Sequence, residues 1–183
     1  MSVYRCFVEK KKAFAVEAAG VLSDLKVVLR NNHIQNVRIL NRYDLENLDK
    51  EDYEKARLTI LSEPQVDDIY DETAPQPEED EWVLAVEYLP GQFDQRADSC
   101  EQCIQLSTCR QRPNVRTARI YYIKGLLTEE DKARIEDALI NPVESRKAKL
   151  EKPETILQSF PKPDFPTQVD GFIAMEEEER KNL

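Results

Sequence analysis

The chain has 183 residues, of which 40% are hydrophobic and 34% are charged, so we expect a globular core and not disorder throughout. Its formal net charge of −10 argues against a nucleic-acid partner, because binding phosphates requires concentrated positive charge. No stretch approaches the ~20 consecutive apolar residues of a membrane span, and the first residues do not resemble a signal peptide. Four cysteines are too few for a disulfide scaffold, so we expect a cytoplasmic protein without a membrane partner.

The first half of the chain predicts two strands and two helices in alternation. Residues 3–9 are rich in β-branched and aromatic types, which favours a strand. From Phe14 to Leu29 the apolar residues recur every three or four positions, which predicts an amphipathic helix. Residues 37–43 alternate as a second strand, and Asp49 is placed to cap a helix that ends before Pro64.

The same order of elements starts again after residues 71–81, "DETAPQPEEDE", a stretch without large apolar groups that predicts a solvated linker. Residues 82–88 predict a strand, residues 94–108 a helix, and residues 116–123 another strand. Thr128 is placed to cap a final helix that extends to Leu139. The element types therefore agree between the two halves.

Residue types also recur between the halves at a nearly constant offset. The offset is 79 residues from Phe14 to Phe93 and 78 residues from Val37 to Val115. Further matches at these offsets are Ala18 with Ala97, Leu25 with Ile104, Tyr43 with Tyr121, Asp52 with Asp131, and Pro64 with Pro142. We therefore predict a tandem duplication whose two copies share a core.

Three of the four cysteines lie close together, with Cys100 and Cys103 spaced C-x-x-C and Cys109 six residues later. A zinc site needs about four ligands. Beside these three cysteines, the remaining candidate ligand is His33, the chain's single histidine. A thioredoxin-type pair would stand at a helix start directly after a strand. Cys100 instead lies between Ala97 and Ile104 in the helical pattern, so we predict that it packs in the core and that the chain binds no metal.

Several segments together resemble a known enzyme family. "VRILNRYDLE", "LPGQFDQRADSCEQCIQL" and "INPVESRKAKLEKPETI" closely resemble the N-terminal region of the large, single-chain phosphoribosylformylglycinamidine (FGAM) synthases of purine biosynthesis, and "FVEKK" and "SEPQVDDIYDE" fit the same pattern. The resemblance covers residues 4 to about 154. In that family this region resembles a fused pair of the small subunit of the multi-subunit enzyme, which agrees with the predicted duplication.

The resemblance implies a role within a ligase and no catalytic residues in this chain. The complete enzyme uses ATP and magnesium to activate an amide oxygen, and ammonia from a glutaminase domain then gives the amidine. The chain has only four glycines and no Gly-rich phosphate loop, so we expect it to bind no cofactor itself. The implied partners are the synthetase and glutaminase domains of the same enzyme, in cis or, in a split gene, in trans. Because the sequence stops within a helical segment, we favour a fragment of a longer product.

The loop that joins residues 82–88 to the following helix is the best candidate for contact with the synthetase domain, because interaction residues concentrate in loops at strand ends. Its six candidate contact residues are Gly91, Gln92, Asp94, Gln95, Arg96 and Asp98. Capping of the helix explains Asp94 equally well. Both interpretations stay open at the level of sequence.

The sequence thus predicts an α+β protein with antiparallel sheets, helices on one face and pseudo-twofold symmetry. The predicted units are residues 1–70, the linker 71–81, residues 82–150, and the start of a linker domain at 151–183. Two other functions compete with the ligase: a stand-alone acidic adaptor built on the repeat, and a thiol- or metal-dependent sensor.

Overall fold

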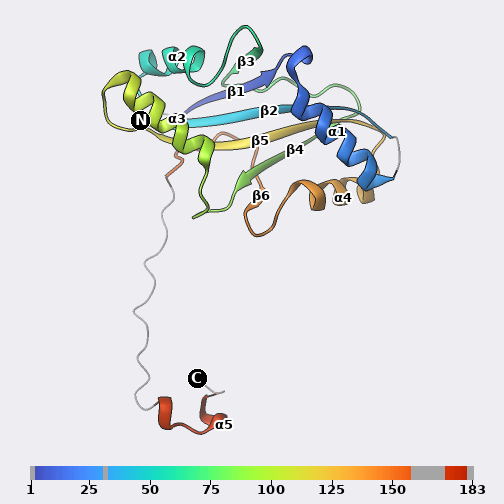
Figure 1. Ribbon diagram of the computed structural model, residues 1–183, viewed down its shortest axis with the longest axis vertical. Coiled ribbons are helices and arrows are strands. Elements are labelled where there is room, and N and C mark those ends of the chain that lie inside the picture. The colour runs from blue at the N-terminus through green and yellow to red at the C-terminus, as the bar shows by residue number, and fades with distance from the viewer. Residues whose placement is uncertain (1–2, 31–32, 158–171, 181–183) are drawn as a thin grey trace.

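A single antiparallel sheet organises the chain. The computed structural model describes residues 3–30, 33–157 and 172–180, and in these residues the strand order is β3-β1-β2-β5-β4-β6 (Figure 1). The strands are β1 (Tyr4–Lys10), β2 (Ile34–Glu46), β3 (Asp67–Asp71), β4 (Glu81–Tyr88), β5 (Asn114–Gly125) and β6 (Ser145–Lys147). The two longest strands, β2 and β5, form the central pair, in which Asn41 lies directly opposite Arg119.

The longer helices connect these strands. They are α1 (Val16–Leu29), α2 (Lys50–Thr59), α3 (Gln95–Thr108) and α4 (Glu129–Leu139), and short helical turns occupy Lys12–Phe14, Phe172–Ala174 and Glu177–Arg180, the last being α5. Thr128 caps α4 as the sequence predicts, in a reciprocal capping box with Asp131. The α+β class is therefore confirmed.

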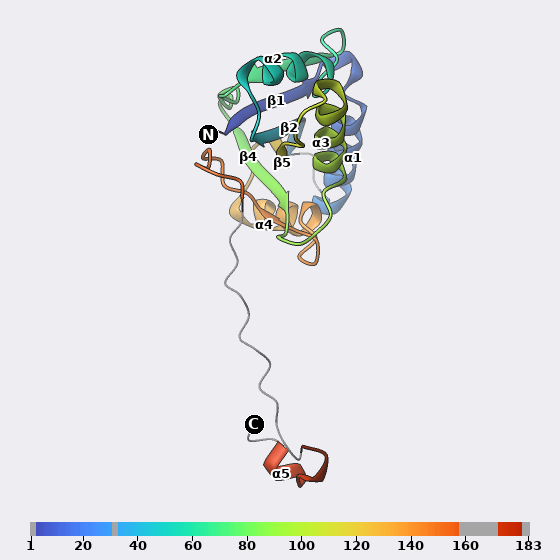
Figure 2. The ribbon, with the colours of Figure 1, turned by 90° about the vertical axis from the view of Figure 1, so that its left-hand side faces the viewer.

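The helices cover one face of the sheet, which we call the helix face. Two apolar clusters lie beneath them: α2 and α3 pack on one cluster, which includes Cys6 and Leu45, and α1 and α4 pack on the other, which includes Ile39 and Leu84. Figure 2 shows α1 and α3 on the same side of the strands. Alternate residues of each strand supply these clusters because strand side chains point to opposite faces in turn.

The opposite face carries charged residues under a covering segment, residues 148–157, which we call the strap. Arg5 pairs with Asp44, at 2.5 Å from Nε to Oδ1, and both side chains are almost fully buried. The strap supplies acceptors to two buried arginines, since Arg5 donates to the Leu150 carbonyl and Arg42 donates to the Lys149 carbonyl, both at 2.7 Å.

A second carboxylate, that of Glu87, gathers three arginines on the strap face. Arg116 and Arg146 lie 2.6 and 2.9 Å from its Oε1, and Arg42 lies 3.6 Å from its Oε2. Farther along, Glu46 accepts hydrogen bonds from the Thr155 hydroxyl and the Ile156 amide. Buried charges persist only when they are paired in this way, so the strap is part of the fold.

Several predictions need correction. The two halves share one sheet in which β2 pairs with β5 edge to edge, so the predicted pairing of two sheets gives a single six-stranded sheet in the described residues. The linker is shorter than predicted, since Asp71 belongs to β3 and Glu81 to β4. The sequence pattern also missed β3 and β6. Pro161, Pro163 and Pro166, which favour an extended segment, lie outside the described residues.

Candidate functional site

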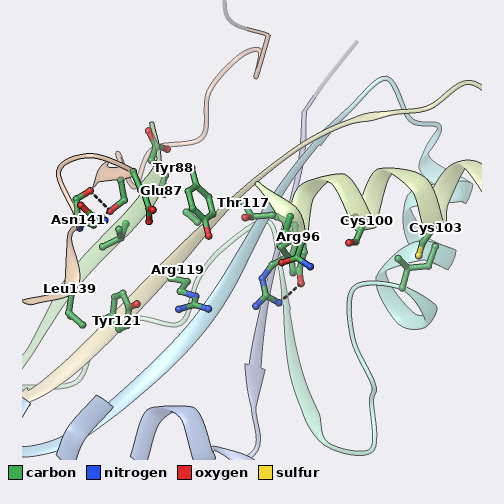
Figure 3. A pocket seen from close by; sticks show the side chains of 18 residues that line it. Glu87, Tyr88, Arg96, Cys100, Cys103, Thr117, Arg119, Tyr121, Leu139 and Asn141 are labelled. Atoms are coloured by element: carbon green, nitrogen blue, oxygen red, sulfur yellow. Dashed lines mark hydrogen bonds between the residues drawn. The ribbon is translucent and has the colours of Figure 1, made fainter. Parts of the chain in front are cut away.

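A groove with a volume of about 620 Å³ lies on the helix face (Figure 3). We call it the central groove. One wall is α3 and the other is the turn that follows α4, and the floor is formed by β2, β4 and β5. The groove therefore lies over the middle of the sheet, where residues from both halves meet.

The floor is built from residues that alternate toward the helix face. Tyr43 of β2 and Thr117 and Tyr121 of β5 are buried there, whereas Arg119 between them is about half exposed. Tyr43 and Thr117 are direct neighbours across the two central strands. Burial raises the pKa of the Tyr43 phenol, so this hydroxyl keeps its proton and can donate a hydrogen bond.

Two guanidinium groups enter the groove from different elements. Arg96, in the first turn of α3, donates from Nη1 to the Tyr43 hydroxyl at 3.3 Å. Arg119, from β5, pairs with Glu17 of α1 at 3.2 Å, and both of these side chains are about half exposed. Figure 3 shows both arginine side chains among the residues that line the groove. The groove therefore presents two guanidinium groups, and Glu87 and Glu144 also line it.

Asp94 fixes the start of α3 on the sheet. Its Oδ1 accepts from the Ala97 amide at 2.9 Å, which is an N-cap, and its Oδ2 accepts from the Thr117 hydroxyl at 2.7 Å. The capping interpretation of Asp94 is thus confirmed. The same carboxylate holds Arg96 over the floor, because it ties the first turn of α3 to β5.

The predicted contact residues fall into three groups. Gln95 and Arg96 line the central groove. Gly91, Gln92 and Asp94 line a smaller adjoining cavity of about 200 Å³ that the strap residue Ile156 also borders. Asp98 lines neither cavity.

The members outside the central groove have structural partners. Asp98 pairs with Arg112 at 2.5 Å. Gln92 donates to the Val143 carbonyl at 3.2 Å, which joins the loop to the turn after α4. Gly91 has φ +87°, a conformation that side-chain-bearing residues rarely adopt, so glycine is required for this turn.

Sequence reasoning missed Arg119, Tyr43 and Tyr121 as site residues. The available signal was Arg119, the second arginine in "RTARIYYI". Strand alternation places Arg119 on the same face as Thr117 and Tyr121. A charged residue at such a position indicates that the face is not fully covered there. The partner from β2 could not be chosen without the pairing of β2 with β5.

The cysteines separate into buried and exposed pairs. Cys6 and Cys100 are buried in the same apolar cluster, so the predicted packing role of Cys100 is confirmed. Burial raises the pKa of each of these thiols to about 12. Cys103 and Cys109 are exposed, and Cys103 lines the central groove. Among the described residues, no three His, Cys, Asp or Glu side chains are grouped as metal ligands would be.

Comparison with known proteins adds no identification. No protein-family model matches the sequence, and no curated protein matches it. In residues 3–30, 33–157 and 172–180, no helix is both long and apolar enough to cross a lipid bilayer.

Proposed function

We propose that this chain is the non-catalytic N-terminal part of an FGAM synthase, the ATP- and glutamine-dependent ligase of purine biosynthesis. Its role is to dock on the synthetase domain and to help organise the interface along which ammonia passes from the glutaminase domain. In this proposal ATP and magnesium are bound by the other domains, in the cytoplasm. The observation that carries the proposal is the agreement of strand registers between the two halves, as a fused pair of small subunits requires.

The registers agree at the same offset that the sequence predicts. Val8 pairs with Ile69 in the first half, and the residues 78 positions later, Val86 and Lys147, pair in the second half. The pairing of β1 with β2 is related to the pairing of β4 with β5 in the same way. In the first half Tyr4 lies opposite Leu45, and in the second half Trp82 lies opposite Ile123. Ile123 follows Leu45 by 78 positions. Trp82 follows Tyr4 by 78 positions.

The central strand pair supports a twofold relation between the halves. Asn41 lies opposite Arg119, and these two residues are themselves 78 positions apart. A twofold axis between two antiparallel strands passes between a residue and its own counterpart in the other copy. Asn41 and Arg119 are counterparts of this kind at the offset of 78. The helices add a second parallel, since α1 and α3 both have 14 residues and both end at a left-handed residue, Arg30 at φ 53° and Cys109 at φ 54°. We therefore infer a tandem duplication.

The duplicated arrangement explains how two small subunits form one body. Separate three-stranded sheets would each expose an edge along β2 or β5, and exposed edges pair with other chains. Joining β2 to β5 pairs these edges, and it places the central groove across the junction. A surface assembled from both copies is suited to dock on a larger catalytic domain.

Binding to the synthetase domain tests the proposal. The 183-residue chain is mixed with an FGAM synthase from which the N-terminal region has been removed, and the mixture is analysed by size-exclusion chromatography with light scattering. We expect a complex of one chain with one truncated enzyme. If the two proteins elute separately at micromolar concentrations, the proposal is wrong.

The second candidate function is a stand-alone acidic adaptor. The open central groove supports an adaptor as much as it supports the ligase proposal, because it can receive a segment of any partner with suitable chemistry. An adaptor would bind a partner unrelated to purine biosynthesis. Failure to bind the truncated synthase, together with specific capture of another single protein, would favour the adaptor.

A further inference from the structure

We propose that the central groove receives an acidic segment of the synthetase domain, with Arg96 and Arg119 pairing with its carboxylates. This inference rests on the proposed function, because it names the surface and the chemistry by which the chain would dock.

The first argument is electrostatic. In the described part of the chain Arg96 makes no ion pair, and its one hydrogen bond goes to the neutral Tyr43 hydroxyl. Arg119 has a single carboxylate partner, Glu17, which is itself about half exposed. A guanidinium carries five N–H donors, so both groups have donors left for a ligand. Bidentate pairing with carboxylates is the interaction for which arginine is best shaped.

The arginines of the strap face show what a structurally satisfied arginine looks like in this protein. Arg5 binds Asp44 through two nitrogens and also donates to the strap. Arg116 and Arg146 share the carboxylate of Glu87. Arg96 and Arg119 therefore have donors left over, in contrast to Arg5.

The second argument is the apolar border of the groove. Tyr88 lines it and is 44% exposed, while Phe93 and Val143 on the adjoining loop and turn are 70% and 71% exposed. The loop and turn are held together by the hydrogen bond from the Leu89 amide to the Glu144 carbonyl at 2.8 Å. Aromatic residues and arginine are the types that carry most binding energy at protein interfaces.

Together these features favour a protein segment over a small anion. A phosphate ion would satisfy the guanidinium groups but would leave Tyr88, Phe93 and Val143 exposed. A chain segment with carboxylates and apolar side chains covers both sets of residues at once.

The natural cysteines provide the test. Cys103 is exposed on the groove wall, and Cys109, at the end of the same helix, is exposed outside the groove. The full chain is treated with N-ethylmaleimide, alone and with the truncated FGAM synthase, and each adduct is quantified by mass spectrometry. With the synthase at about ten times Kd, we expect alkylation of Cys103 to slow about tenfold while that of Cys109 is unchanged.

Charge reversal identifies the groups responsible. Arg96→Glu and Arg119→Glu should each weaken binding at least about tenfold and remove the protection of Cys103. Arg110→Glu makes the same charge change at an exposed arginine outside the groove and should bind as the wild type does. Arg96→Gln and Arg119→Gln serve as milder variants, and circular dichroism verifies that each variant is folded.

The outcomes separate the two proposals. If a complex forms but Cys103 stays reactive, or if the glutamate variants bind normally, the groove assignment is overturned and the proposed function stands. If no complex forms, both are overturned. If millimolar inorganic phosphate alone protects Cys103 as well as the synthase does, the groove is a small-anion site, and the inference of a protein segment is wrong.

Discussion

The two faces of the sheet use arginine in opposite ways. On the strap face Arg5 and Arg42 are almost completely buried, and each is bound to the Asp44 carboxylate and to a strap carbonyl. On the helix face Arg96 and Arg119 stand at the surface of the central groove, and within the described residues Arg96 has no carboxylate partner and Arg119 has one. Coordination and burial, more than residue type, therefore distinguish an arginine that stabilises the fold from one that is available to a partner.

The difference has an energetic cause. A charge taken out of water is tolerated only when pairing and hydrogen bonds replace its hydration, so removing one partner of a buried pair is costly. An exposed pair contributes little, because water and ions screen it. Substitutions on the strap face should therefore change stability, and substitutions in the groove should change binding.

The largest expected effect is that of Asp44→Asn. It leaves Arg5 and Arg42 buried without their shared carboxylate, so we expect a loss of about 3–5 kcal/mol in unfolding free energy, measured by urea denaturation. Glu144→Gln, at an exposed residue on the groove rim, is the matched control and should be neutral. A change below about 1 kcal/mol for Asp44→Asn would show that the strap-face pairs do not hold the fold.

Cys100→Ala should have an intermediate effect. It removes a buried sulfur from the cluster beneath α2 and α3, and we expect a cost of about 1–2 kcal/mol at pH 7. Cys103→Ala, on the exposed side of the same helix, should be neutral in the same denaturation experiment. Equal effects of the two substitutions would contradict the assignment of Cys100 to the core.

The buried thiols predict a loss of stability in alkali. Burial raises the pKa of Cys100 from 9.0 to about 12, so the folded state keeps a proton that the unfolded state loses above pH 9. The contribution of the protonated thiol to the unfolding free energy is complete below pH 9. It declines between pH 9 and 12, by about 1.4 kcal/mol per pH unit for one thiol. Denaturation of the wild type and of Cys100→Ala at pH 8 and pH 10 isolates this term, and the variant should have the smaller pH dependence. Parallel curves would exclude it.

Arg96→Ala should have the smallest effect on stability, about 0.5 kcal/mol or less, because the side chain is exposed and its contact with Tyr43 is long. In a complete FGAM synthase with this N-terminal region, the same substitution should uncouple glutamine hydrolysis from amidine formation. The ratio of glutamate to amidine produced is the measurement. A wild-type ratio with wild-type stability would remove Arg96 from the docking surface.

Much of the secondary structure could be predicted from local patterns. Thr128 and Asp94 mark their helix starts because a short polar side chain satisfies free amides there. The strand β2 proved longer than predicted, Ile34–Glu46, because Asp44 and Glu46 resemble loop residues until their partners are known. Arg5 binds Asp44, and the strap binds Glu46. The edge strands β3 and β6 exist through pairing with β1 and β4, which no local pattern reveals.

The site was less accessible to sequence reasoning than the fold. Arg96 was predicted because it belongs to the predicted strand-end loop. Arg119 lies in mid-strand and becomes a site residue only when α3 and the turn after α4 leave its part of the sheet uncovered. Asp98 shows the reverse, since it belongs to the predicted loop and is used by Arg112. Local sequence indicates where a polar residue lies, but its availability depends on which elements cover it.

The most direct test of the account is reconstitution of glutamine-dependent activity. An FGAM synthase that lacks its N-terminal region is assayed for amidine formation from glutamine, with and without the 183-residue chain added. We predict that the chain restores coupled activity and that Arg96→Glu in the chain prevents this. Activity that the chain leaves unchanged would contradict the proposed function.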